Sequence, residues 1–154
     1  MKLYLVQHAK ADVKAGETER TLTEEGIAEL LKIASFLKIH ARVSPHTIFH
    51  SEKIRAKQTA DILAEHITPQ HIQEVPTGLA PMDDPGEWVK KANELTDDCM
   101  IVGHMPHLSK LATTLLERKD DKMSISFRNS GVVCLQYIDN DWTLLWTVIP
   151  EILK

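Results

Sequence analysis

Three apolar segments of strand length constrain the fold of this chain more than any other feature. They are residues 3–6, 47–50 and 99–102. Each ends at polar residues or at glycine, and a stretch with helical periodicity follows each of them along the chain. Parallel strands need a long crossover connection, which a helix usually supplies, so strands that alternate with helices form parallel sheets. The alternation therefore predicts an α/β fold built on a mostly parallel sheet.

Four helices are expected to accompany these strands. Thr23 is a suitable N-cap for the first helix, because acidic residues follow it and the apolar spacing continues to about Lys38. The second helix is expected after Ser51, a candidate N-cap, and carries Arg55 in its first turn. The third and fourth helices are expected near residues 88–95 and 106–115.

Two further strands are expected at residues 131–137 and 142–148. Asp139, Asn140 and Asp141 lie between them and favour a tight turn, so the two strands should form a hairpin. Residues 10–20, 77–85 and 117–122 are polar and are expected to be loops. Residues 1–154 are therefore expected to form a single three-layer α/β domain, with helices on both faces of the sheet and an antiparallel hairpin at the C-terminal end.

The composition narrows the range of partners and locations. The formal net charge is −4, whereas general nucleic-acid binders usually carry a basic excess, so no nucleic-acid partner is expected. No apolar stretch has the length of a membrane span, and the N-terminal apolar run is too short for a signal peptide. Cys99 and Cys134 lie in apolar runs and are expected to be buried thiols. These features predict a cytoplasmic protein that has no membrane partner.

Candidate functional residues follow all three predicted parallel strands. His8 follows the first strand, Ser51 and Arg55 follow the second, and His104 follows the third. Ligands of open α/β sheets bind beyond the carboxyl ends of the strands. If these strands are parallel neighbours, His8, Arg55 and His104 converge at one edge of the sheet.

Two histidines and an arginine suit phosphoryl transfer. A neutral imidazole is a competent nucleophile near pH 7, so His8 is expected to take the phosphoryl group. Arg55 is expected to bind phosphate oxygens through its forked guanidinium, and a protonated His104 to donate to them as charge builds. This chemistry needs no cofactor. His104 and His107 have the spacing of metal ligands, but no acidic or thiol partner lies nearby, so no metal site is expected.

Four segments carry a resemblance to a known family. Residues 5–9 read Leu-Val-Gln-His-Ala, residues 20–26 contain Arg-Thr-Leu-Thr and then glycine, residues 51–60 contain Arg55, Gln58 and Thr59, and residues 102–106 read Val-Gly-His-Met-Pro. In this order they resemble the motifs of the histidine phosphatase superfamily, and especially its small SixA-type phosphohistidine phosphatases. The resemblance implies a phosphoglycerate mutase-like fold and a phosphatase that forms a phosphohistidine on His8.

Gln7 departs from that family, whose first motif normally has arginine at this position. Its amide keeps hydrogen-bond donors but carries no charge, and a bond to a charged group contributes about 1.5–3 kcal/mol against about 1 kcal/mol for a neutral one. The resemblance assigns phosphate binding to Gln7, Ser51, Arg55 and His104. Arg20 is either a further phosphate ligand or an ion-pair partner within its loop.

The general acid is the least evident part of the predicted site. Larger members of the family use a carboxylate from an inserted segment, and here the loop that contains Asp83 and Asp84 is the only evident source. Both residues are also typical of turns. A phosphohistidine substrate would not need a strong acid, because a protonated imidazole leaves readily.

The sequence therefore predicts a phosphohistidine phosphatase that acts on a phosphorylated protein. Its short loops provide no evident lid, which favours a site that the histidine of a protein can reach. Two alternatives stay open: a phosphatase for a small phosphorylated molecule, with the same nucleophile, and a weakly active phosphoryl-binding protein, because Gln7 replaces arginine.

Overall fold

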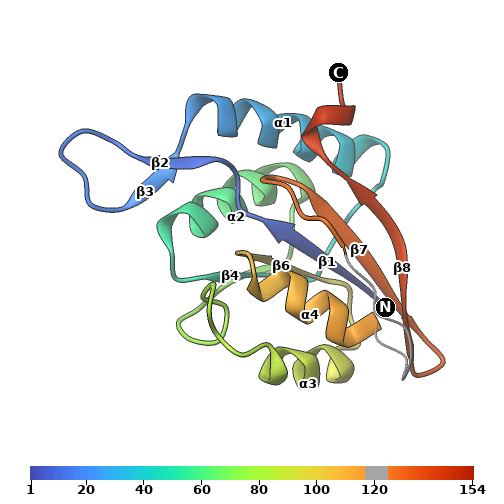
Figure 1. Cartoon of the computed structure of the whole chain (residues 1–154). Helices are drawn as coiled ribbons and strands as arrows, with labels where there is room; N and C mark the ends of the chain where they lie inside the picture. Colours follow the sequence, from blue (N-terminus) through green and yellow to red (C-terminus); the bar gives the residue numbers. More distant parts are fainter. Residues whose placement is uncertain (117–124) are drawn as a thin grey trace.

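A six-stranded sheet with the strand order β5-β4-β6-β1-β7-β8 runs through the domain (Figure 1). The computed structural model describes residues 1–116 and 125–154. The sheet contains, in chain order, β1 (Lys2–Gln7), β4 (Thr47–Ser51), β5 (His71–Val75), β6 (Cys99–Gly103), β7 (Val132–Ile138) and β8 (Asp141–Val148).

The pairing of these strands confirms the mostly parallel sheet. β1 runs parallel to β6, β6 runs parallel to β4, and β4 runs parallel to β5. On its other side β1 pairs antiparallel with β7, which forms the C-terminal hairpin with β8. β4, β6 and β1 are thus parallel neighbours, and their carboxyl ends lie at the same edge of the sheet.

Helices cover both faces of the sheet, which gives the expected three layers. α1 (Glu24–Ile39) and α2 (Ile54–Ile67) pack on one face, and α3 (Gly86–Glu94) and α4 (His107–Leu116) pack on the other (Figure 1). The chain ends in a short 3-10 helix, η1 (Pro150–Ile152), beside α1.

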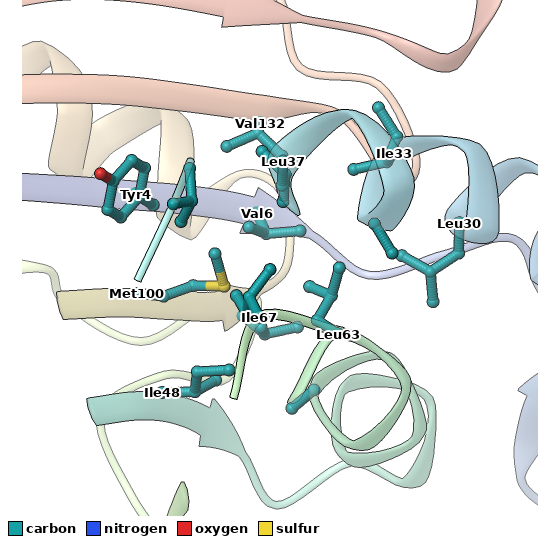
Figure 2. Packing of buried hydrophobic residues seen from close by; sticks show 14 of the residues in the cluster. Tyr4, Val6, Leu30, Ile33, Leu37, Ile48, Leu63, Ile67, Met100 and Val132 are labelled. Atoms are coloured by element: carbon teal, nitrogen blue, oxygen red, sulfur yellow. The ribbon is translucent and has the colours of Figure 1, made fainter. Parts of the chain in front are cut away.

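Successive side chains of β1 enter opposite cores, because side chains alternate between the two faces of a strand. Tyr4 and Val6 pack with the buried residues of α1 and α2 (Figure 2). Leu3 and Leu5 pack with those of α3 and α4. A strand that is buried on both faces must be apolar throughout, which explains the unbroken apolar run at the start of the chain.

The start of α1 holds the chain segment that follows β1. Thr23 caps the helix as expected, because its hydroxyl accepts a hydrogen bond from the Gly26 amide at 2.9 Å. The Thr23 amide in turn donates to the Lys10 carbonyl at 3.0 Å. A Cβ atom at Gly26 would lie only 2.3 Å from that carbonyl oxygen, so glycine permits the close approach.

Two expectations about the secondary structure are wrong, and one strand was missed. Residues 10–20 are not a simple loop, because β2 (Ala11–Val13) pairs antiparallel with β3 (Arg20–Leu22). β5 was not expected, since four of its five residues are exposed and give no apolar pattern. Ser51 is the last residue of β4, and Lys53 is the N-cap of α2, without a side-chain capping bond.

Other expectations are confirmed. Asp139 and Asn140 form the tight turn between β7 and β8, with φ angles of 53° and 60°. Cys99 and Cys134 are buried and free. The loop expected at 117–122 lies outside the described residues. Within residues 1–116 and 125–154, no helix combines the length and the apolar character that a membrane crossing needs.

Candidate active site

The carboxyl ends of β1, β4 and β6 bring the predicted site residues together. His8 follows β1, Ser51 ends β4, and His104 follows β6. The His8 amide donates to the Gly103 carbonyl at 3.0 Å, which fixes the two strand ends side by side. The imidazole rings of His8 and His104 lie 5.1 Å apart between their centroids.

The His8 ring is held in one orientation and one tautomer. Its Nδ1 lies 2.7 Å from the carbonyl oxygen of Ala9. Because a carbonyl oxygen can only accept a hydrogen bond, Nδ1 carries the proton and Nε2 keeps its lone pair. The Nε group of Arg55 donates to this Nε2 at 3.3 Å. The lone pair of His8 Nε2 thus accepts the hydrogen bond from the Arg55 guanidinium.

Thr59 connects the nucleophile segment to helix α2. Its hydroxyl oxygen accepts a hydrogen bond from the Ala9 amide at 3.0 Å and donates to the Arg55 carbonyl at 2.7 Å. Thr59 is fully buried. The same hydroxyl therefore fixes the residue that orients His8 and the helical turn that carries Arg55.

The environment of His8 keeps its ring neutral. Burial, with smaller contributions from the charges of Arg55 and Arg20, lowers the pKa of His8 to about 4, although the hydrogen bond to Ala9 opposes the shift. At neutral pH Nε2 is therefore unprotonated and able to attack an electrophile. Burial, followed by the charge of Arg20, also lowers the pKa of Arg55.

His104 differs from the sequence-based expectation in its charge. It is 1 % exposed, and its Nε2 lies 2.5 Å from the Ser51 hydroxyl oxygen. Burial, followed by the charges of His8 and Arg55, lowers its pKa to about 3. His104 was expected to be protonated, but it is neutral at pH 7, since charging it would require a desolvated cation beside other cations. A phosphoryl anion beside the ring would raise this pKa again.

Ser51, Gln7 and Arg20 differ in their surroundings and in their contacts. The Ser51 hydroxyl contacts His104 and accepts a hydrogen bond from the Lys53 amide at 3.3 Å. Gln7 pairs with Gly103 in the sheet, and its half-buried amide has no hydrogen bond to any described residue. Arg20 is exposed and donates to the Ala11 carbonyl at 3.1 Å. Their contacts with phosphate stay predictions.

Asp83 and Asp84 have structural partners in the loop before α3. The Asp83 carboxylate accepts hydrogen bonds from the amides of Gly78 and Ala80, at 2.9 and 3.0 Å. Asp84 accepts one from the Gly86 amide at 2.7 Å. Neither carboxylate has a hydrogen bond to His8, Arg55 or His104 in the described structure, so the geometry favours the turn role for both.

Two residues near the site were not expected from the sequence. The Asn129 side chain donates to the His8 carbonyl at 2.9 Å. The Ser130 amide donates to the Gln7 carbonyl at 3.0 Å. The Asn-Ser-Gly turn before β7 is visible in the sequence, but its place beside His8 follows only from the antiparallel pairing of β7 with β1.

The sequence and the fold are similar to those of known proteins. Residues 3–77 match the family model of the histidine phosphatase superfamily (branch 1). No curated protein matches the chain at a significant level. The fold is similar to that of the protein histidine phosphatase SixA, solved in complex with tungstate, with a TM-score of 0.86 and 22 % identity over 98 % of each chain.

Two other solved structures extend the comparison. A putative phosphohistidine phosphatase SixA from Agrobacterium tumefaciens has a TM-score of 0.79 and 23 % identity over 97 % of each chain. A putative alpha-ribazole-5'-P phosphatase from Escherichia coli K-12 has a TM-score of 0.71 and 16 % identity, over 94 % of this chain and 95 % of that one. Together the matches confirm the resemblance to the histidine phosphatase superfamily and its phosphoglycerate mutase-like fold, and they support a phosphatase.

Proposed function

We propose, from the match of this chain to the histidine phosphatase superfamily in sequence and fold, that it is a phosphohistidine phosphatase. In this proposal it moves the phosphoryl group of a protein substrate to Nε2 of His8 and from there to water. The observation that carries the proposal is the state of the His8 ring. Its Nδ1 proton is committed to the Ala9 carbonyl, and its pKa of about 4 leaves Nε2 unprotonated at neutral pH. The Nε2 lone pair accepts a hydrogen bond from Arg55, and it attacks when the guanidinium turns to the phosphoryl oxygens.

In the first step the lone pair of His8 Nε2 attacks phosphorus, and the bond between phosphorus and the substrate nitrogen breaks. The leaving imidazole keeps that electron pair. If its other nitrogen is protonated, it departs as neutral imidazole, so this step requires no carboxylic acid. This fits the engagement of Asp83 and Asp84 with loop amides.

In the second step water adds to phosphorus and the bond to Nε2 breaks. The electron pair returns to Nε2, inorganic phosphate carries away the water-derived oxygen and its protons, and His8 is again neutral. The Arg55 guanidinium and an N–H of His104 are the donors for the equatorial oxygens in both steps.

The burial of the two rings limits the substrates that can react. His8 is only 5 % exposed. The phosphoryl group must therefore project from its carrier to reach Nε2, as it does on the histidine side chain of a protein.

A phosphatase for a small phosphoester is the second candidate, because the fold is also similar to that of a putative alpha-ribazole-5'-P phosphatase. An alkoxide leaving group needs a proton, and general acid catalysis typically contributes about 10²–10⁴-fold. In the described structure no carboxylate has a hydrogen bond to His8, which favours the phosphohistidine substrate.

The test compares kcat/KM for a phosphohistidine peptide and for an alkyl phosphate, with His8→Ala as the control. We expect the peptide to be preferred by about a hundredfold or more, the range set by the missing general acid. A preference for the alkyl phosphate would establish the second candidate. A protein that binds phosphate but turns over neither substrate would be a phosphoryl-binding protein, as the neutral Gln7 allows.

A further inference from the structure

The candidate site has little positive charge for a ligand that carries up to two negative charges. His8 and His104 are neutral at pH 7, and Gln7 has an uncharged amide. Arg55 contributes one charge beside His8 Nε2, and the exposed Arg20 acts on His8 and Arg55 through its charge. A desolvated phosphoryl anion needs cationic or strongly donating partners on several oxygens. A second cation near His104 would complete the site.

Lys53 is placed to supply this charge. Its backbone amide donates to the Ser51 hydroxyl oxygen at 3.3 Å, and that oxygen lies 2.5 Å from Nε2 of His104. The Lys53 main chain is therefore separated from the His104 ring by a single hydroxyl group. A lysine side chain is a flexible four-carbon stem that ends in three donors, long enough to bridge such a separation.

The side chain of Lys53 is not engaged elsewhere in the described part of the chain. Lys53 is half-buried and forms no ion pair there, whereas Lys10 is paired with Glu25 and Glu29, and Lys57 with Asp61. It also makes no capping hydrogen bond at the start of α2. Its charge nevertheless acts on the site, because it contributes to the lowered pKa of His104.

We propose that Lys53 is a phosphate-binding residue whose ammonium group binds the phosphoryl oxygens on the His104 side of the site. With Arg55 it forms a pair of cations provided by the first turn of α2 and its N-cap. This inference rests on the proposed function, since it concerns the same phosphoryl group. Arg20 is less suited to the role, because it is exposed and its guanidinium already donates to the Ala11 carbonyl.

The test measures the dissociation constant of inorganic phosphate for the wild-type chain, Lys53→Met and Lys57→Met, by calorimetry at low ionic strength. Lys57→Met is the matched control, because it removes one positive charge from the same helix at an exposed position. We expect Lys53→Met to bind phosphate about tenfold more weakly, because it loses one charge-assisted hydrogen bond. Lys57→Met should bind phosphate as the wild type does.

Two further measurements separate binding from a structural effect. Lys53→Arg should retain most of the affinity, because it keeps the charge. In Lys53→Met the dissociation constant should also depend less steeply on salt, because a screened charge is gone. If Lys53→Met fails to fold, the same comparison is made with Lys53→Gln.

The outcomes distinguish this inference from the proposed function. Wild-type affinity for phosphate in a folded Lys53→Met or Lys53→Gln protein would overturn the role of Lys53 and leave the phosphatase proposal intact. A wild-type chain that neither binds phosphate nor turns over a phosphorylated peptide would overturn both.

Discussion

The hydroxyl group of Thr59 provides a sharp test of how the site is assembled. Thr59→Val keeps the shape of the side chain but removes the hydroxyl oxygen that accepts the hydrogen bond of the Ala9 amide. Ala9 is fully buried, so its amide is left without a partner. A buried donor without a partner costs about 1–3 kcal/mol. The Arg55 carbonyl loses its bond to the hydroxyl as well, but it keeps its place in the backbone ladder of the helix.

We therefore expect Thr59→Val to lower the free energy of unfolding by about 2 kcal/mol. For a chain of this length that corresponds to a fall in Tm of about 4–8 °C. Turnover should fall as well, because Ala9 supplies the carbonyl that orients His8, and a displacement of about 1 Å at a reacting atom can cost about 100-fold in rate. Urea unfolding and kcat with a phosphohistidine peptide measure the two effects.

Thr114 offers a matched control for this substitution. Its hydroxyl donates to the Lys110 carbonyl four residues earlier at 2.8 Å, as the Thr59 hydroxyl does to Arg55, but Thr114 is exposed on α4. Thr114→Val should change the free energy of unfolding by less than about 0.5 kcal/mol. Thr59→Ser should remain close to the wild type, because it keeps the acceptor. If the Thr59→Val protein is as stable and as active as the Thr114→Val protein, the reasoning is refuted.

Three further predictions concern charge in the site. Because protonation removes the His8 lone pair, the fall of kcat/KM on the acid side should have a midpoint near pH 4; an acid-side midpoint near 6.5 would contradict the buried, neutral ring. The folded-state pKa values of His8 and His104 lie below the unfolded value of about 6.5, so the unfolded chain takes up protons first. The contribution of these two histidines to the free energy of unfolding should therefore be complete above about pH 6.5 and should be lost as the pH drops toward 4. An unchanged urea midpoint between pH 7.5 and 5 would contradict this. Gln7→Arg should tighten phosphate binding about tenfold by adding a charged donor, and unchanged binding in a stable variant would show that Gln7 does not limit the site.

Much of the fold could be predicted because its signals are local. The Thr23 cap, the Asp139–Asn140 turn and the apolar runs of the central strands all lie within a few residues of the elements that they define. β5 gives no such signal, because an exposed edge strand needs no apolar face. The ribbon of β2 and β3 has only three residues in each strand, too few for a visible period.

The site could be predicted in position but not in its interactions. Strand ends and parallel order are sufficient to bring His8 and His104 to one edge. Their charge depends on burial and on the neighbouring cations, which a linear pattern does not give. The contact of Asn129 with the His8 carbonyl depends on the register of β7 against β1, a pairing between distant segments. The roles of Asp83 and Asp84 depend on loop amides that only the folded chain presents.

The central claim is that His8 carries the phosphoryl group during turnover, and direct detection of that group tests it. The full-length protein is mixed with a phosphohistidine peptide, quenched within milliseconds under alkaline conditions that preserve phosphohistidine, and mapped by mass spectrometry. The account predicts one modified residue, His8, with phosphate on Nε2, and no modification in His8→Ala. Phosphate on another residue, or undiminished turnover by His8→Ala, would contradict it.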